Sequence, residues 1–336
     1  MTSADGRCAT GPRCRGFTLT ELAIVLAVMV PLVLFVLDVL GPVLAFQGGL
    51  DNRRQLAEVR QAFTAAYRDN PVTVDSEAGA RFVLPGGTIE AVGPDATTGR
   101  CASGPATLAP LARYLSQSAS TAFRDGFAAP MCILMTARLS RAIGGVDTFY
   151  RVVAIVAPGP NGRLDTIGAC ATALSAAGEL TLCGDDEGVM VDGFNIAAEL
   201  LRHTLVRMQM AATAYQVYFQ SRAQADPSRD ASINYFASGG TPAERWDVGG
   251  PMPLSACSAP SPLLVAGGTG PSTTLGLSSI DVTDHYGQVM QYDNCSNQVR
   301  SPQNADAAQQ VPPYTASIVT TLPGGTVLRV NAVGAL

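Results

Sequence analysis

The chain has 336 residues, a formal net charge of −5 and 47% hydrophobic residues, so it is long enough for one large or two ordinary domains beside a membrane segment. All 22 basic residues are arginines, which excludes any mechanism that requires a lysine, such as a P-loop nucleotide site or Schiff-base catalysis. The net negative charge, together with arginines that are scattered along the chain, predicts that the protein has no nucleic-acid partner.

An uncharged segment near the N-terminus has the length of a membrane span. Residues 22–37 carry no charge, and counting from Phe17 gives 21 residues, about 31 Å of helix, close to the thickness of a bilayer core. The arginines that precede the segment are Arg7, Arg13 and Arg15. They place the N-terminus in the cytoplasm and the bulk of the chain beyond the membrane. Gly41 and Pro42 are expected to loosen the helix just after the segment.

The residues at the start of this segment read Gly16-Phe17-Thr18-Leu19-Thr20-Glu21, after a short leader that contains arginine. This start resembles that of type IV prepilins and the related pseudopilins. The resemblance implies that a prepilin peptidase cuts after Gly16, releasing the leader 1–16, and that the new terminus at Phe17 is methylated. It also implies that Glu21 pairs with the terminal amine of a neighbouring pilin or pseudopilin subunit, within a transmembrane and assembly helix of residues 17–46. A carboxylate that enters hydrocarbon needs such a partner, because its burial alone is costly.

Three other interpretations of the segment stay open. Glu21 could lie at the level of the lipid headgroups, where it needs no partner. The segment could instead be an ordinary secretory signal, cut after Val43-Leu44-Ala45, because it has a basic start and an apolar middle. It could also be an uncut single-span anchor.

Beyond this segment the sequence predicts an α+β fold. Leu56, Val59 and Phe63 recur at helical spacing within residues 50–69 and predict an amphipathic helix that ends before Pro71. In the pilin family this helix would be the soluble half of the long N-terminal helix, packed on a small sheet. A β-rich run, a second amphipathic helix and two strands are expected at 149–157, 194–220, 314–322 and 326–333.

Residues 125–131 and 284–290 share the frame Asp, any residue, aromatic residue, small residue, two further residues and Met. Both stretches resemble the Asp-Pro-Trp-Gly-x-Pro motif of pilin-like heads, although the first proline and the tryptophan are replaced here. Each stretch follows an amphipathic helix and precedes strands. The sequence therefore predicts a long hydrophobic helix followed by one or two pilin-like heads, each an amphipathic helix packed on an antiparallel sheet. Two heads would cover residues 47–190 and 191–336, and one large elaborated head is the alternative.

Eight cysteines are present, and Cys8 and Cys14 lie in the leader. The six that remain follow the membrane segment and are Cys101, Cys132, Cys170, Cys183, Cys257 and Cys295. An even number in an exported region indicates disulfides, and none of the six shows the C-x-x-C spacing of a zinc site. One cysteine precedes and one follows each of the two Asp frames, at similar distances along the chain. These equivalent positions suggest the pairs Cys101–Cys132 and Cys257–Cys295, which leaves Cys170–Cys183 as the third pair.

Residues 157–166 resemble a turn that is common after the last strand of pseudopilin heads, and some relatives bind calcium nearby. Hard oxygen ligands of the kind that calcium prefers lie in this turn and in the acidic loop after Cys183. The candidate ligands are Asn161, Asp165, Asp185, Asp186 and Glu187. The alternative is a β-turn beside a solvated acidic loop, without a cation.

Catalytic signatures such as G-x-S-x-G or H-E-x-x-H are absent from the sequence, and the two histidines, His203 and His285, are expected to be surface or capping residues. We therefore expect a structural subunit rather than an enzyme. The expected protein is a minor or tip-located subunit of a type IV pilus or type II secretion pseudopilus, which sits in the bacterial inner membrane before assembly. A membrane-anchored binding or adhesion protein that forms no filament is the alternative.

Overall fold

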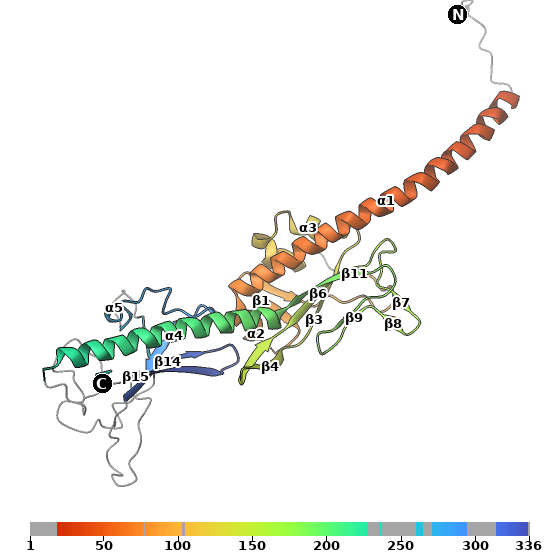
Figure 1. The fold of residues 1–336 in the computed structure, drawn as a ribbon. Coiled ribbons are helices and arrows are strands. Elements are labelled where there is room, and N and C mark those ends of the chain that lie inside the picture. The colour runs from red at the N-terminus through yellow and green to blue at the C-terminus, as the bar shows by residue number, and fades with distance from the viewer. Residues whose placement is uncertain are drawn as a thin grey trace, which may run out of the picture.

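The computed structural model describes residues 19–76, 78–102, 105–227, 235–236, 260–264, 271–293 and 314–334. Within these ranges the fold is α+β, with a long apolar helix at the N-terminus and antiparallel sheets behind it, as the sequence predicts (Figure 1). Gly16, Phe17, Cys257 and Cys295 lie outside the described residues, so the cleavage site and the third disulfide stay predictions.

Helix α1 spans Leu19–Asp69, 51 residues or about 77 Å. Its apolar part reaches a mean hydropathy of 2.9 with no part of that stretch buried, so the helix is long and apolar enough to cross a membrane. Gly41 and Pro42 do not end the helix, because α1 runs through both Pro31 and Pro42. Figure 1 shows a gentle curve instead of a break. A proline removes one backbone hydrogen bond, and this bends a helix without ending it when the adjoining turns stay bonded.

The second half of α1 supplies the first part of the core. Val59, Phe63 and Tyr67 are fully buried at intervals of four residues. Phe82 of strand β1 (Arg81–Leu84) meets the rings of Phe63 and Tyr67 edge-on, with centroids 5.2 and 5.7 Å apart. The helix ends at Asp69 as predicted, because Pro71 cannot continue it and instead begins the next short helix.

The first sheet has three antiparallel strands in the order β11-β6-β3, formed by Glu187–Asp192, Val152–Ala157 and Cys132–Met135. Every residue of the central strand β6 is buried, which explains its continuous apolar sequence. Helix α1 packs on β6 and β11. Shorter elements surround this sheet: α2 (Pro71–Ser76), β2 (Gly87–Glu90), η1 (Pro105–Tyr114), α3 (Ala119–Ala122), β4 (Leu139–Ile143), β5 (Val146–Tyr150), β7 (Thr166–Ile167), β8 (Cys170–Ala171), β9 (Ala173–Leu174) and β10 (Leu180–Thr181).

The β-rich run predicted at 149–157 is two strands in two sheets. Strand β5 ends at Tyr150 and pairs with β4, whereas β6 begins at Val152 and lies in the three-stranded sheet. Arg151 separates them, because its N–H donates to the hydroxyl of Tyr67 (3.0 Å) and its carbonyl accepts from the N–H of Gly193 (3.0 Å). With both backbone groups bonded elsewhere, the residue cannot continue the ladder of β5.

Helix α4 spans Gly193–Ala225 and thus extends beyond the predicted residues 194–220. Asp192 caps it, because its carboxylate accepts from the N–H of Phe194 (2.9 Å). Gly193 is required at the first position, since a Cβ there would collide with the carbonyl oxygen of Arg151 and the hydroxyl oxygen of Tyr67.

A second sheet lies against α4 and has the order β12-β13-β14-β15 (Ser261–Pro262, Gln291–Asp293, Tyr314–Thr321, Val327–Gly334). The strands predicted at 314–322 and 326–333 are confirmed as β14 and β15. Phe219 of α4 is fully buried, and Gly334 leaves room for its ring. The short helix α5 (Pro271–Thr274) lies nearby.

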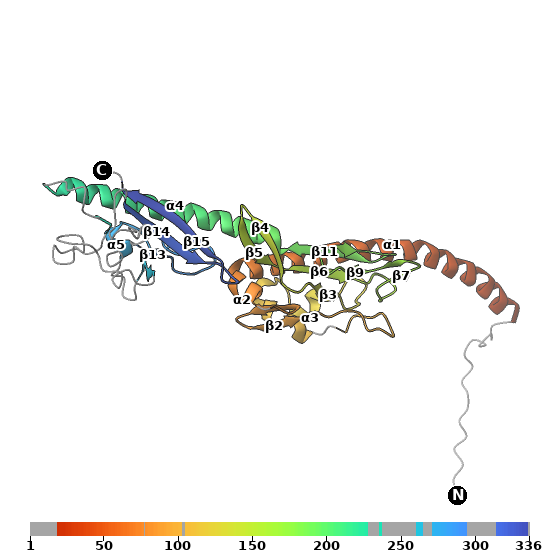
Figure 2. The ribbon, with the colours of Figure 1, turned by 90° about the horizontal axis from the view of Figure 1, so that it is seen from below.

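A helix, an Asp turn and three antiparallel strands occur twice in this order among the described residues, with different elements between them. In the first, α1 is followed by the 125–131 turn and by β3, β6 and β11, which are neighbours in one antiparallel sheet. In the second, α4 is followed by the 284–290 turn and by β13, β14 and β15, which are neighbours in the same antiparallel order. Figures 1 and 2 show α4 continuing the general direction of α1 beyond the first sheet.

Candidate functional site

The Asp125 turn is closed by the carboxylate of Asp125. Its Oδ1 accepts from the N–H groups of Phe127 (2.9 Å) and Ala129 (2.7 Å), while its own N–H donates to the carbonyl of Ala129 (2.8 Å). Ala128 adopts a positive φ of 66°, which an L-residue tolerates only at a tight turn such as this. Burial raises the pKa of Asp125, and the two backbone N–H groups oppose that shift.

The Asp284 turn repeats this arrangement atom for atom. Oδ1 of Asp284 accepts from the N–H groups of Tyr286 (2.9 Å) and Gln288 (2.8 Å), and its own N–H donates to the carbonyl of Gln288 (2.8 Å). Gly287, with a φ of 81°, stands where Ala128 stands in the first turn. Oδ2 additionally accepts from the hydroxyl of Thr320 in β14 (2.7 Å), so the carboxylate joins the turn to the sheet.

Both turns press an aromatic residue against the helix that precedes them. A Cβ on Gly48 of α1 would enter the ring of Phe127, and a Cβ on Gly126 would collide with the carbonyl oxygen of Gly48. In the second turn the hydroxyl of Tyr286 donates to the carbonyl of Ala197 in α4 (3.3 Å). The two turns therefore set the distance between each helix and its sheet.

Two of the three expected disulfides lie within the described residues. Cys101 bonds to Cys132 with their Cα atoms 5.1 Å apart, and Cys170 bonds to Cys183 with their Cα atoms 6.0 Å apart. The first bond holds the start of β3 to the long loop before it. The second closes the segment 170–183 immediately before the acidic loop, so both pairings that the sequence predicts here are confirmed.

Four of the five candidate calcium ligands come together. Ligand atoms of Asp165, Asp185 and Asp186 lie within 4.8 Å of one another. The amide Nδ2 of Asn161 donates to Asp165 Oδ1 (2.9 Å) and to Asp185 Oδ1 (3.0 Å), and so bridges the two carboxylates. Gly184 approaches so closely that a Cβ there would overlap Asp165 Oδ2. The two loops that carry these residues thus converge.

The fifth candidate, Glu187, lies elsewhere. Its carboxylate accepts from the side-chain amide of Asn52 (2.7 Å) and pairs with Arg53 (3.2 Å), both on α1. Glu187 is the first residue of β11, and its side chain is directed to the helix that covers this sheet. The prediction that it belongs to the cation site is therefore wrong, because adjacent strand residues point to opposite faces.

The carboxyl groups of Asp165, Asp185 and Asp186 lie close enough to raise one another's proton affinity. Burial raises the pKa of Asp186, and burial together with the nearby Asp165 carboxyl raises the pKa of Asp185. Hydrogen bonds from Asp185 lower the pKa of Asp165. Of the two carboxyl groups, Asp185 therefore holds a proton more strongly than Asp165. Asp186 is 7% exposed, and among the described residues its Oδ1 has no hydrogen-bond partner, whereas its Oδ2 accepts from Asp165 N–H and Thr172 Oγ1. A hard divalent ion bound between the three carboxylates would offset their mutual repulsion.

The sequence did not predict a buried polar cluster where α1 and α2 meet the residue between β5 and β6. Tyr67 donates through its hydroxyl to Asp75 Oδ1 (2.6 Å), and Nε of Arg151 lies 3.9 Å from the same carboxylate. The Arg151 side chain is 0% exposed, and its Nη1 donates to the carbonyls of Gly79 and Arg81. The signal in the sequence is an arginine between apolar residues of a β-rich run, at 149–157.

The two histidines lie together, although 82 residues separate position 203 from position 285 along the chain. The rings of His203 on α4 and His285 in the second turn have centroids 4.9 Å apart, and the N–H of His285 donates to Thr204 Oγ1 (3.1 Å). Burial, helped by Arg207 and His203, lowers the pKa of His285. Both residues pack the second turn on α4, where they are partly exposed.

The remaining predicted residues belong to the start of α1. Glu21 is in the first turn of the helix, which begins at Leu19 in the described chain. No protein-family model matches the sequence, and neither the curated proteins nor the solved structures contain a match, so the functional argument rests on the residues and the geometry above.

Proposed function

We propose that the protein is a pilin-like subunit of a type IV pilus or a type II secretion pseudopilus. The observation that carries the proposal is helix α1. Its exposed apolar half is continuous, within one 51-residue helix, with a half that holds the core of the first sheet. Any displacement of the apolar half must therefore move the folded part with it, which suits a subunit that is lifted from a membrane into a filament.

The sequence at the start of α1 supplies the chemistry for such a process. A prepilin peptidase cuts between Gly16 and Phe17, and the new terminal amine of Phe17 becomes methylated. Glu21 then pairs with the terminal amine of a neighbouring subunit. Between Leu19 and Leu50 the charged residues are Glu21 and Asp38 alone, so the helix offers an apolar surface to other subunits once it leaves the lipid.

Size and repetition favour a minor subunit near the tip over a major subunit of the shaft. Each of the two helix–turn–sheet units is a pilin-like head in this proposal, and a double head is bulky for dense repeated packing. Before assembly the protein sits in the inner membrane as a single-pass protein with its heads in the periplasm. The Asp165 cluster and the two disulfides then stabilise the first head outside the cytoplasm.

The role of Glu21 provides the experiment. Glu21→Ala should leave membrane insertion intact and reduce incorporation into filaments by more than about tenfold, because removal of one partner from a buried charge pair costs roughly 3–5 kcal/mol. Thr20→Ala, one position earlier on the same helix, is the matched control. Filaments sheared from cells and quantified by immunoblot give the readout. Normal incorporation of the Glu21→Ala protein would contradict the proposal and would favour the membrane-anchored binding protein that forms no filament.

A further inference from the structure

The only two histidines of the sequence are in contact within the second helix–turn–sheet unit, which consists of α4, the 284–290 turn and β13–β15. His203 lies on α4 and His285 in the turn, with ring centroids 4.9 Å apart and ring planes inclined by 39°. Both residues are partly exposed, so protons from the solvent reach them. Imidazole has an ordinary pKa of about 6.5, so a small fall in pH below neutrality places two positive charges side by side.

The first unit has no titratable group at the equivalent position of its turn. Gly126 follows Asp125 as His285 follows Asp284. A Cβ at Gly126 would collide with the carbonyl oxygen of Gly48 on α1, so the backbone of the first turn lies directly on its helix. The second turn instead places an imidazole against its helix. Two turns with one hydrogen-bond pattern therefore differ in the response to acid that we expect from them.

Two arginines of α4 lie beside the histidine pair. Nη2 of Arg202 is 3.1 Å from Nε2 of His203. Because a guanidinium can only donate, this nitrogen must accept, and its protonation removes the hydrogen bond. Arg207 donates through Nη1 to the carbonyl of Thr283 (2.7 Å), two residues before His285. A proton on either imidazole therefore adds positive charge next to an arginine that is always charged.

The carboxylates near the pair are engaged elsewhere. Asp284 accepts hydrogen bonds with both of its oxygens, from two N–H groups of its own turn and from a hydroxyl of β14. Glu199 on α4 accepts from Arg68 of α1 (2.8 Å). Asp281 accepts from the N–H and the hydroxyl of Ser278 (2.9 and 2.6 Å). Neutralising an imidazolium would cost one of these carboxylates its present partners.

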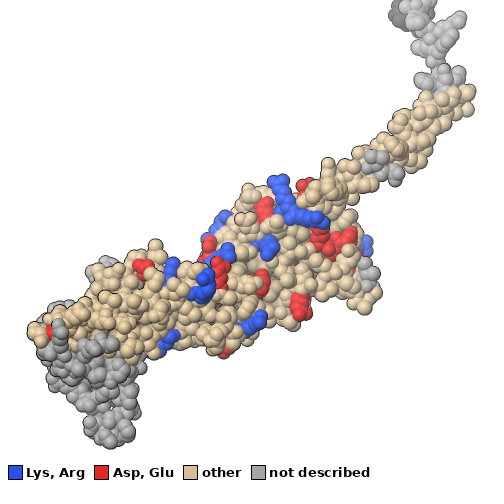
Figure 3. All heavy atoms as spheres, in the orientation of Figure 1, with Lys and Arg blue, Asp and Glu red and all other residues tan. Residues whose placement is uncertain are grey.

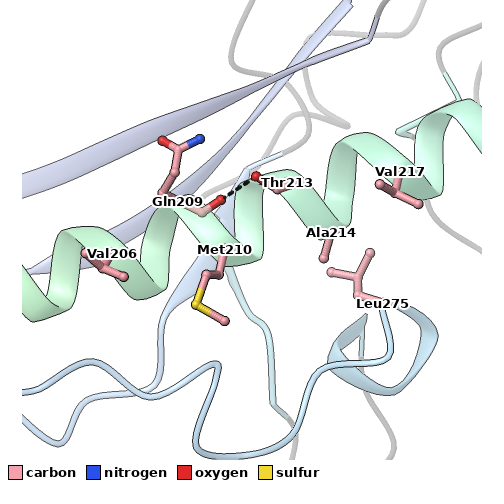
Figure 4. A pocket seen from close by; sticks show the side chains of 7 residues that line it. All are labelled: Val206, Gln209, Met210, Thr213, Ala214, Val217 and Leu275. Carbon is pink, nitrogen blue, oxygen red and sulfur yellow. Dashed lines mark hydrogen bonds between the residues drawn. The ribbon is translucent and has the colours of Figure 1, made fainter.

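The other elements of the second unit add little charge. Residues 208–221 of α4 carry none, and Figure 4 shows the apolar side chains of Met210 and Val217 on this stretch. In the sheet, Asp293 and Arg329 pair with each other (2.6 Å), and β14 has no charged residue. Figure 3 shows charged side chains gathered over the middle of the molecule, with few on the visible face of the α4 half.

The balance of these groups sets the direction of the pKa shift at His285. Burial, then Arg207 and His203, lower the pKa of His285 below its ordinary value of 6.5, against lesser opposing effects of Asp284 and Glu199. The unfolded chain therefore binds this proton more readily than the folded chain. The contact contributes its full stability above pH 6.5 and loses it as the pH falls below that value.

The contact of His285 with α4 is one of those that hold the second turn in place. Its N–H donates to Thr204 Oγ1 (3.1 Å), and the hydroxyl of Tyr286 donates to the carbonyl of Ala197 (3.3 Å). Tyr286 is buried, and so is Met290 at the end of the turn. A turn that leaves α4 would therefore open the core of the second unit to water.

We propose that His203 and His285 form a pH switch, which holds the second turn on α4 at neutral pH and releases it when both rings are protonated. Repulsion between two imidazolium rings and the loss of the hydrogen bond from Arg202 both drive the release. The opening is confined to the second unit, because the first turn has glycine where the second has histidine. The switch acts within one chain and does not depend on the proposed function.

Hydrogen exchange of the full chain, purified in detergent, tests the switch at pH 7.5 and pH 5.0. Mass spectrometry follows the peptides that cover 284–290 and 125–131, after correction for the intrinsic exchange rate at each pH. On acidification, wild-type protection at 284–290 should fall at least about threefold more than in His285→Gln, whose amide takes up no proton in this range. The peptide that covers 125–131 should behave alike in the two proteins.

Two further variants separate titration from packing. His203→Gln removes the pair from the side of α4 and should flatten the pH dependence as His285→Gln does, even if one of the two variants fails to fold. Thr204→Ala removes the acceptor of the His285 N–H but no titratable group. It should loosen the turn equally at both pH values and keep the wild-type pH dependence.

An acid-induced loss of protection at 284–290 that is as large in both glutamine variants as in the wild type overturns the switch. A difference between wild type and variant that appears equally at 125–131 also overturns it, because the opening would then not be confined to the second unit.

Discussion

The buried cluster of Tyr67, Asp75 and Arg151 places a carboxyl group and a guanidinium in the core without a direct hydrogen bond between them. Arg151 Nη1 donates to the carbonyls of Gly79 and Arg81, and its Nε stays 3.9 Å from Asp75. The buried carboxyl therefore has a hydrogen bond from Tyr67 and a long ion pair with Arg151 in place of water. Burial raises the pKa of Asp75 to about 7, against lesser opposing effects of Tyr67, Arg151 and Arg138.

The raised pKa of Asp75 predicts a pH dependence of stability. Between its ordinary pKa near 3.8 and about 7, the folded protein holds the proton that the unfolded chain releases. The free energy of unfolding should therefore fall as the pH rises across this window, by up to about 4 kcal/mol for a shift of this size. Asp75→Asn, which has no proton to lose, should flatten this decline.

Urea unfolding of the wild type and of Asp75→Asn between pH 4 and pH 8 measures this effect, and the difference between the two proteins removes the contribution of other carboxylates. The wild type should lose stability relative to the variant as the pH rises. A gain relative to the variant would mean that Asp75 is a low-pKa partner of Arg151 in a true ion pair, which contradicts the account.

The Asp165 cluster predicts a calcium effect. Millimolar calcium should raise the unfolding temperature, because an ion that binds only the folded state stabilises it by mass action. Asp165→Asn should remove most of the shift, since Asp165 contacts both Asn161 and the backbone of Asp185. For a bound ion the amide of Asn161 must turn its oxygen inward and give up the hydrogen bond from Arg163 N–H (2.8 Å).

Differential scanning fluorimetry with calcium, and with magnesium for comparison, provides the measurement. Glu179→Gln is the matched control, because Glu179 is exposed and lies outside the cluster. An unfolding temperature that does not respond to calcium, or that responds equally in Asp165→Asn, would show that the cluster is a solvated acidic loop.

At the scale of elements, the two Asp turns connect helix to sheet in both units. Asp284→Ala should destabilise the protein by roughly 3 kcal/mol, because it leaves the N–H groups of Tyr286 and Gln288 and the hydroxyl of Thr320 without their acceptor. Asp281→Ala, three residues earlier, removes a surface carboxylate that bonds only locally with Ser278 and should change stability little. Equal losses in the two variants, measured by chemical unfolding, would contradict this role for the turn.

Elements with strong local periodicity could be predicted from the sequence. The end of α1 before Pro71, the second amphipathic helix, and strands β14 and β15 follow from apolar spacing and from proline. The two frames at 125–131 and 284–290 share a residue pattern in the sequence, and the structure shows that both are turns with one hydrogen-bond pattern.

Features that depend on contacts distant in the sequence could not be predicted in this way. The division of 149–157 at Arg151 depends on the hydroxyl of Tyr67, which lies 84 residues earlier. The pairing of Glu187 with Asn52 depends on the helix that covers β11, and this contact removed one residue from the predicted cation site. The sequence identified Asp165, Asp185 and Asp186 as candidate ligands, but only the fold shows that they converge.

At the scale of the whole molecule, two helix–turn–sheet units follow one another along a line that begins with an exposed apolar helix (Figure 2). Each unit presents the outer face of its helix, charged in α1 beyond Leu50 and apolar in α4.

The N-terminus of the mature protein tests most directly whether this chain is processed and assembled as a pilin-like subunit. Protein isolated from its host is digested, and the N-terminal peptide is identified by mass spectrometry. The account predicts a terminus at Phe17 that carries a methyl group on its amine. An intact Met1, as in an uncut anchor, or a terminus at Phe46, as after a secretory signal, would contradict it.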